Sequence, residues 1–171
     1  MQERGRREVF TSLFGKKDAE KNQNKLCVRP PYQKEGVDFL TACHACVTHA
    51  CVGACEENII VLDATNAPYL DFSKGGCTFC EACAKACDED VLSFTCNPTP
   101  SLHVKVKIDI LACMAWHQSV CQSCLDACEM RAIHFLGLFR PQINATLCNG
   151  CGMCVNRCPS DAMHVYEKEE S

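Results

Sequence analysis

The sequence lacks the short motifs with which most enzymes bind nucleotides or attack a substrate. It contains no phosphate-binding loop, no glycine-rich dinucleotide motif after a strand and no nucleophile constellation. No apolar run approaches the length of a membrane span. Aromatic residues make up only 7% of the chain, with a single tryptophan. We therefore expect no catalytic residues and no membrane span, and an ordinary hydrophobic core would be thin.

Cysteine is the residue that the chain has in excess, with 18 among 171 residues. Sixteen of them form four groups, which we call tetrads one to four: Cys43-x2-Cys46-x4-Cys51-x3-Cys55, Cys77-x2-Cys80-x2-Cys83-x3-Cys87, Cys113-x7-Cys121-x2-Cys124-x3-Cys128 and Cys148-x2-Cys151-x2-Cys154-x3-Cys158. Tetrads two and four match the bacterial ferredoxin spacing, in which three cysteines bind one cluster and the fourth, on the following helix, reaches a neighbouring one. We therefore predict four [4Fe–4S] clusters with these sixteen cysteines as ligands.

Three other uses of these cysteines fit the pattern less well. A disulfide scaffold needs an export signal, and cysteines separated by two residues are poorly placed to bridge one another. Zinc sites usually combine two CxxC pairs from separate knuckles, whereas here a third cysteine follows each pair closely. Sixteen free thiols would be chemically reactive. Cys27 and Cys96 lie outside the tetrads, and we expect them to be plain thiols.

The formal net charge of −4 counts cysteine as neutral. Each oxidised cluster with its four thiolates would add a charge of about −2, so the loaded protein would be strongly acidic and nucleic acid is not an expected partner. Residues 1–26 differ, with seven Lys or Arg against four acids. We predict a basic flexible arm, with a short helix at 9–14, that is either a solvated tail or a docking arm.

The arm contains Arg6-Arg7, which faintly resembles a twin-arginine export signal. The apolar stretch that such a signal needs does not follow, because residues 15–25 are mostly polar and charged. We therefore expect a cytoplasmic protein, in a reducing compartment suited to oxygen-sensitive clusters.

Each tetrad is followed by an extended apolar stretch, at residues 59–62, 91–94, 132–135 and 162–166. The segments that join tetrad one to two and tetrad three to four both predict strand, turn and strand, with turns at 66–68 and 137–141. We predict an α+β fold of two tandem ferredoxin-like modules with two clusters each, at 38–95 and 104–167. The linker at 96–103 has boundary composition, and a strand is expected to follow it.

Loop lengths favour pairing between adjacent tetrads. Cys55 and Cys77 are separated by 21 residues and Cys128 and Cys148 by 19, enough for one hairpin, whereas 25 residues with a proline-rich break separate tetrads two and three. The expected ligand sets are therefore Cys43, Cys46, Cys51 with Cys87; Cys77, Cys80, Cys83 with Cys55; Cys113, Cys121, Cys124 with Cys158; and Cys148, Cys151, Cys154 with Cys128. A nested scheme, pairing tetrad one with four and two with three, stays open.

Several neighbours of the cysteines are irregular. Glu56, Asp88 and Glu129 follow three of the fourth cysteines, whereas Pro159 follows the last. A carboxylate there either disfavours adding an electron to a nearby cluster or only caps the next turn. Trp116 in the x7 spacer either shields a cluster or packs on the sheet. Every tetrad already has four thiols, so we expect none of the histidines to be a ligand, namely His44, His49, His103, His117, His134 and His164.

The arrangement as a whole resembles the NapF family of four-cluster ferredoxin-type accessory proteins. The order of the four tetrads with the unusual x7 spacer carries most of the resemblance. Further shared features are Arg6-Arg7, Arg29-Pro30-Pro31-Tyr32, Phe39-Leu40-Thr41, Cys55-Glu56-Glu57-Asn58-Ile59, Gln118-Ser119-Val120, Pro141-Gln142-Ile143-Asn144 and Leu147-Cys148-Asn149-Gly150-Cys151-Gly152. The x4 spacer of tetrad one departs from the family, which tends to x2 there.

The resemblance implies a cytoplasmic protein that contacts the catalytic subunit of periplasmic nitrate reductase before its export. It would help that subunit acquire its iron–sulfur centre or supply electrons for doing so. The residues themselves indicate only electron transfer through several clusters. The alternatives are an electron-transfer subunit of another soluble oxidoreductase complex and a structural protein whose clusters only hold the fold together.

Overall fold

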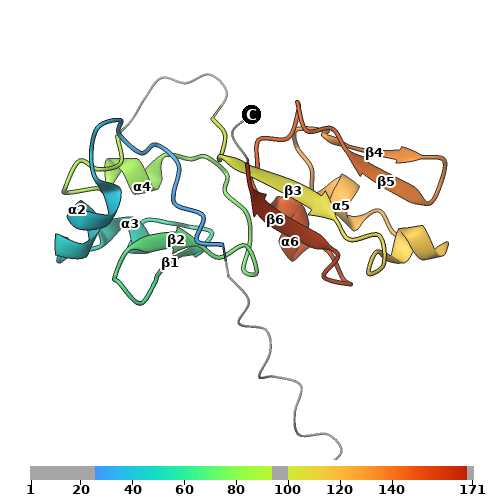
Figure 1. Ribbon diagram of the computed structural model, residues 1–171, viewed down its shortest axis with the longest axis horizontal. Helices are drawn as coiled ribbons and strands as arrows, with labels where there is room; N and C mark the ends of the chain where they lie inside the picture. Colours follow the sequence, from blue (N-terminus) through green and yellow to red (C-terminus); the bar gives the residue numbers. More distant parts are fainter. Residues whose placement is uncertain (1–25, 94–99, 169–171) are drawn as a thin grey trace, which may run out of the picture.

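The computed structural model describes residues 26–93 and 100–168. The predicted basic arm with its short helix at 9–14 lies outside these residues, apart from Leu26, as do Cys96 and the first half of the predicted linker, residues 96–99. Figure 1 shows two halves side by side, which we call the first half (26–93) and the second half (100–168). In the described residues no helix is long and apolar enough to cross a membrane.

The first half consists of three short helices and one hairpin: α2 (Phe39–Ala45), α3 (Ala50–Gly53), β1 (Ile60–Leu62), β2 (Pro68–Leu70) and α4 (Ala82–Lys85). Asp38 caps the start of helix α2, because its carboxylate accepts hydrogen bonds from the N–H groups of Leu40 and Thr41. Strands β1 and β2 pair in antiparallel register, as the sequence predicts. Pro68 belongs to β2 rather than to the turn, in the first strand position, where proline is tolerated.

The second half contains a 3-10 helix, two short helices and two antiparallel pairs: β3 (Val104–Ile108), η1 (Met114–His117), α5 (Ser123–Asp126), β4 (Ile133–Leu136), β5 (Arg140–Ile143), α6 (Met153–Asn156) and β6 (Met163–Glu167). Strand β3 pairs with β6, and β4 pairs with β5. The predicted strand after the linker and the second predicted hairpin are therefore present. Residues 91–93 form no strand and contribute one isolated bridge, between Gln33 and Leu92.

One structural unit recurs at the end of each tetrad. Helices α3, α4, α5 and α6 each carry the third cysteine of a tetrad, and the fourth cysteine lies two residues beyond the helix rather than on it. A turn follows, closed by a hydrogen bond from the N–H three residues on to the carbonyl of the cysteine. The residue at that position has a positive φ in all four units: Asn58, Asp90, Arg131 and Asp161. The next side chain is only 1% exposed in each: Ile59, Val91, Ala132 and Ala162.

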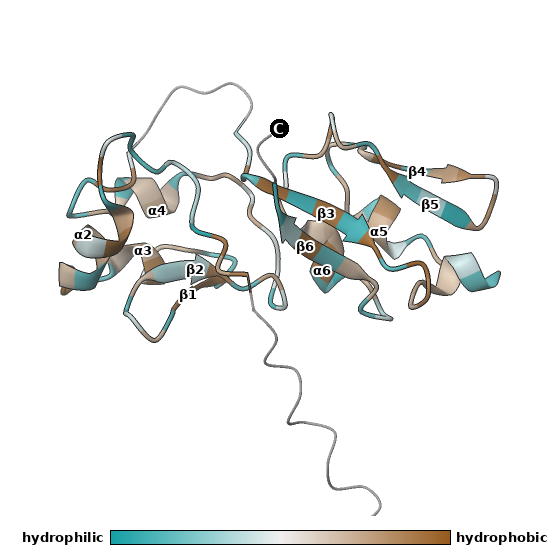
Figure 2. Ribbon diagram, in the orientation of Figure 1, coloured by the Kyte–Doolittle hydropathy of each residue, from teal (hydrophilic) through white to brown (hydrophobic). Residues whose placement is uncertain are grey.

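Cysteines form part of the core in both halves. The core of the first half combines aliphatic and aromatic side chains with Cys43, Cys51 and Cys83. The second half has two smaller buried groups, which include Cys113 and Cys154. Figure 2 shows that β3 alternates between hydrophilic and hydrophobic residues, so its thin sheet buries one side. Buried thiols therefore contribute to the core of each half.

Candidate functional site

The structure brings the sixteen tetrad cysteines together in four cavities with four thiols each. We name them site 1 (Cys43, Cys46, Cys51, Cys87), site 2 (Cys55, Cys77, Cys80, Cys83), site 3 (Cys113, Cys121, Cys124, Cys158) and site 4 (Cys128, Cys148, Cys151, Cys154). Their empty volumes, counting the part open to solvent, lie between about 340 and 380 Å³. Four cavities of one size with one set of lining thiols suit one kind of occupant.

In every site three thiols come from one tetrad and one from its adjacent partner. The short helices explain this arrangement, because each carries a cysteine of one site, and four residues after that cysteine comes a cysteine of the other site. Helix α3 thus holds Cys51 at site 1 and leads to Cys55 at site 2. Helix α4 does the reverse with Cys83 and Cys87. The grouping of thiols is that of the adjacent scheme.

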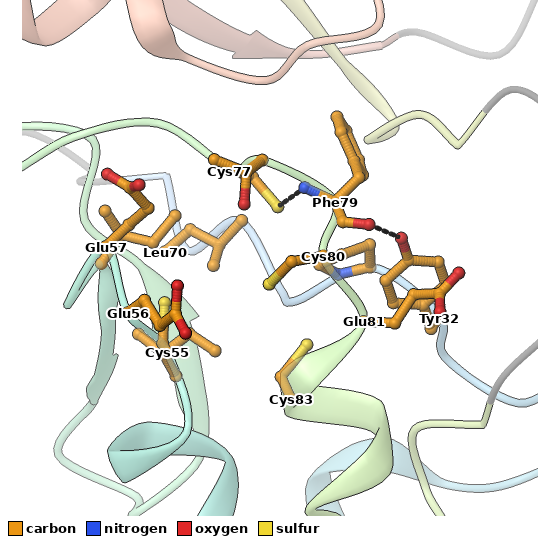
Figure 3. Close-up of a pocket in the computed structure, with 14 residues that line it drawn as sticks. Tyr32, Cys55, Glu56, Glu57, Leu70, Cys77, Phe79, Cys80, Glu81 and Cys83 are labelled. Atoms are coloured by element: carbon orange, nitrogen blue, oxygen red, sulfur yellow. Dashed lines mark hydrogen bonds between the residues drawn. The ribbon is translucent and has the colours of Figure 1, made fainter.

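Backbone N–H groups point at several of the sulfur atoms. At the fourth cysteines, the N–H groups of Leu92, Ala132 and Ala162 lie 3.4, 3.3 and 3.2 Å from the sulfurs of Cys87, Cys128 and Cys158. At the loops, the N–H of Phe79 lies 3.4 Å from Cys77 Sγ, and that of His49 lies 3.4 Å from Cys46 Sγ. Figure 3 shows the Phe79 contact at site 2, where the four sulfurs face a common space. Such donors stabilise a thiolate over a thiol.

Without a positively charged occupant, several of these thiols have pKa values well above the ordinary value for cysteine. Burial, together with the neighbouring cysteines, raises the pKa of Cys77 to about 12 and that of Cys154 to about 12. Burial likewise raises the pKa of Cys43, Cys83 and Cys124 to about 11. Four thiolates in one cavity repel each other. All four thiols of a site therefore ionise together only when cationic metal binds there.

The carboxylates that follow three of the fourth cysteines differ in how close they lie to a site. Glu56 lines site 2, and Asp88 lines site 1, where its Oδ2 accepts a 2.8 Å hydrogen bond from the Thr48 hydroxyl. Glu129 is exposed but is close enough to raise the pKa of Cys151 at site 4, after burial and other contributions. Site 3 is lined by Pro159 instead. The four sites therefore have the same thiols but different surrounding charge.

Three histidines near the tetrads contact backbone carbonyls through their rings. His44 Nδ1 lies 2.8 Å from Thr65 O, His49 Nε2 lies 2.8 Å from Asn66 O, and His117 Nε2 lies 2.9 Å from Leu111 O. Trp116 belongs to η1, which packs against β5, and the guanidinium of Arg140 lies 5.8 Å from its ring centre. Each of these contacts ties a side chain to a neighbouring loop or strand.

Sequence reasoning gave no role to the segment Arg29-Pro30-Pro31-Tyr32, which the structure places beside site 2. Arg29 binds the turn of the first hairpin, with 2.9 Å to Asp63 and 3.1 Å to the carbonyl of Pro68. Tyr32 lines site 2 and donates to the carbonyl of Phe79 between two of its cysteines. The Pro-Pro pair was the available signal, because it indicates a stiff extended strap.

The thiols fit a polynuclear cluster. In the described residues no three His, Cys, Asp or Glu side chains are close enough to hold a single metal ion. The four thiols of each site instead surround a space, an arrangement suited to a [4Fe–4S] cluster, which takes one thiolate on each iron. The apolar cavity walls and the backbone donors at sulfur complete this fit.

Comparison with known proteins identifies the family. Residues 141–164 match the family described as a 4Fe-4S binding domain. The ferredoxin-type protein NapF of Escherichia coli K12 is 39% identical over 140 residues, which cover 80% of this chain and 82% of that protein. The ferredoxin-type protein NapF of Haemophilus influenzae is 34% identical over 154 residues, which cover 87% of this chain and 84% of that protein. This α+β chain is therefore an iron–sulfur protein that belongs to the NapF family of ferredoxin-type proteins.

Proposed function

We propose that the chain holds four [4Fe–4S] clusters, one at each of sites 1 to 4, in two modules with the predicted bounds 38–95 and 104–167. The observation that carries the proposal is the gathering of four thiols around each of four cavities of similar size. Clusters of this type accept and release single electrons. The chain positions the thiols and donates N–H groups to several of their sulfurs.

The cluster count is open to a direct test. Protein purified without oxygen should contain about sixteen irons and sixteen sulfides per chain, because four cubanes require that number. A preparation that fills only two sites under the same conditions, or one loaded with zinc, contradicts the proposal. Redox titration then separates electron transfer from a structural role, because clusters that never change state at physiological potentials would serve only to hold the fold.

Within the cell, the proposed role is that of an accessory protein in the cytoplasm. Membership of the NapF family supports an association with the periplasmic nitrate reductase system, whose catalytic subunit is the proposed client before its export. The protein would help to load or reduce that subunit's iron–sulfur centre. The alternative is an electron-transfer subunit of another soluble oxidoreductase complex, which would stay bound to the mature enzyme.

A pull-down experiment distinguishes these two roles. The tagged chain should capture the catalytic subunit that still carries its export signal, and not the exported enzyme. Residues 1–26 are basic, and the rest of the chain with its clusters bound is acidic. Binding should therefore weaken with added salt. Deleting residues 1–26 should weaken capture while leaving the iron content unchanged. Recovery of the chain as a fixed subunit of active reductase contradicts the accessory role.

A further inference from the structure

The two halves meet directly at the cysteine loops of sites 2 and 4. The backbone N–H of Cys77 donates a 2.7 Å hydrogen bond to the carbonyl oxygen of Cys151. Cys77 lines site 2 and Cys151 lines site 4. In Figure 3 a ribbon of the second half passes close to Cys77. One hydrogen bond thus joins a thiol-bearing residue of each half.

Close packing on both sides of this bond keeps the loops together. A Cβ atom at Gly76 would lie 2.5 Å from the backbone nitrogen of Met153, and one at Gly152 would collide with the ring of Phe72. Asn156 Nδ2 donates a 2.8 Å hydrogen bond to the carbonyl of Ser73. Glycine at 76 therefore permits a close approach to the backbone of Met153, and glycine at 152 leaves room for the ring of Phe72.

Within each half, the short helices join the remaining sites. Helices α3 and α4 pack together and each connects site 1 to site 2 through one cysteine of each site. Helices α5 and α6 pack together and connect site 3 to site 4 in the same way. Sites 1 and 3 take no part in the contact between Cys77 and Cys151. A path from site 1 to site 3 along these contacts therefore passes through site 2 and then site 4.

Resting on the proposed cluster occupancy, we propose that the contact between Cys77 and Cys151 is the electron crossing between the two halves, which makes the sites one series in the order 1, 2, 4, 3. With clusters bound, Cys77 would help to hold the one that gives up the electron and is oxidised, and Cys151 would help to hold the one that accepts it and is reduced. No bond is broken and no proton moves. Tunnelling falls steeply with distance and is favoured through hydrogen bonds, and this short bond joins a residue that lines site 2 to one that lines site 4.

The ends of this series carry the two irregular spacers. Val47, in the x4 spacer beside Cys46 of site 1, is 91% exposed, and Val120, in the x7 spacer beside Cys121 of site 3, is 86% exposed. Sites 2 and 4, on either side of the crossing, keep the regular ferredoxin spacing. The longer loops therefore lie where electrons enter and leave the series, and the regular loops lie where the halves pack.

The crossing can be tested by electron paramagnetic resonance on the full chain loaded with iron. Replacing Cys43, Cys46, Cys113 and Cys121 by serine removes sites 1 and 3 and leaves about half the iron. In this background the fully reduced spectrum should show interaction between the spins at sites 2 and 4. Adding Gly76→Ala should abolish the interaction, and the control Gly53→Ala, whose Cβ would meet nothing within 4 Å, should preserve it.

The intact chain provides a second measurement that does not depend on the serine background. Gly76→Ala, and Asn156→Asp with its repulsion of the Ser73 carbonyl, should each raise amide hydrogen exchange around both 73–77 and 151–156, at unchanged iron content. Spins at sites 2 and 4 that do not interact, or an interaction that persists in Gly76→Ala, would overturn the crossing. A wild-type chain that binds no iron at all would instead refute the proposed clusters themselves.

Discussion

The hydroxyl of Tyr32 donates a 2.8 Å hydrogen bond to the carbonyl oxygen of Phe79, and so ties the strap of residues 29–32 to the loop of site 2. Phe79 has a φ of 55°, a conformation that costs free energy in a bulky residue. Burial, reinforced by nearby cysteines and Glu81, raises the pKa of Tyr32 to about 12. The phenol therefore stays protonated, and able to donate, throughout the physiological range.

Tyr32→Phe should make site 2 lose iron more easily than the other sites. The change removes one hydrogen bond, worth about 1 kcal/mol, and leaves the strained loop at Phe79 less well held. The measurement is the rate of iron release to a chelator. The quarter of the iron that site 2 holds should be released about fivefold faster. Tyr166→Phe, on half-exposed β6, is the control. Equal rates in the two variants would show that the strap does not support the site.

The repeated turns predict opposite effects of glycine at two exposed arginines. Arg131 has a φ of 51°, so Arg131→Gly relieves strain and should raise the stability of the loaded protein by up to about 1 kcal/mol. Arg157 has a φ of −82°, and Arg157→Gly should lower stability by about 0.5–1 kcal/mol, because glycine loses more backbone entropy there. Thermal loss of the visible absorbance under anaerobic conditions measures both. A lower midpoint for Arg131→Gly contradicts the argument.

Filling of the sites should release protons and improve with rising pH. Burial raises the pKa of the Cys77 and Cys154 thiols to about 12, so these groups are protonated in the folded, cluster-free chain at neutral pH. They must become thiolates to bind iron. Raising the pH from about 7 to about 9 should therefore increase the yield of anaerobic reconstitution, and an unbuffered titration should record acid release. A yield independent of pH contradicts this assignment.

The different carboxylates should give the four sites different reduction potentials. Glu56 lines site 2, so Glu56→Gln removes a negative charge that opposes reduction there and should raise that potential by tens of millivolts, on the order of 1 kcal/mol. Glu167→Gln, at the end of β6, serves as the matched control. Site 3, lined by Pro159, should have the highest potential of the four. Potentiometric titration followed by paramagnetic resonance measures each shift.

The cysteine spacing predicted the local structure near the tetrads, because a short loop followed by a helix restricts the backbone to few conformations. The first hairpin and the β4–β5 hairpin follow from apolar runs separated by turn residues, and both are present. Long-range contacts had no comparable signal. Nothing near Gly76 in the sequence indicates that its backbone meets Met153, and the hydrogen bond between Tyr32 and Phe79 joins residues 47 apart.

Each tetrad contributes its fourth cysteine to the site of the adjacent tetrad, and this arrangement can be tested with one cysteine. Cys55 follows α3 from tetrad one but lines site 2 with Cys77, Cys80 and Cys83. Cys55→Ser should therefore release the thiols of tetrad two for alkylation, detected by mass spectrometry, and lower the iron content by up to a quarter. Because Cys43, Cys46 and Cys51 have their fourth thiol from Cys87, they should stay protected. Cys27→Ser, outside the tetrads, should change neither the iron content nor the alkylation of the tetrad cysteines. If Cys148, Cys151 and Cys154 became reactive instead, the nested pairing of the tetrads would be correct, since only that scheme brings a cysteine of tetrad one to the loop of tetrad four.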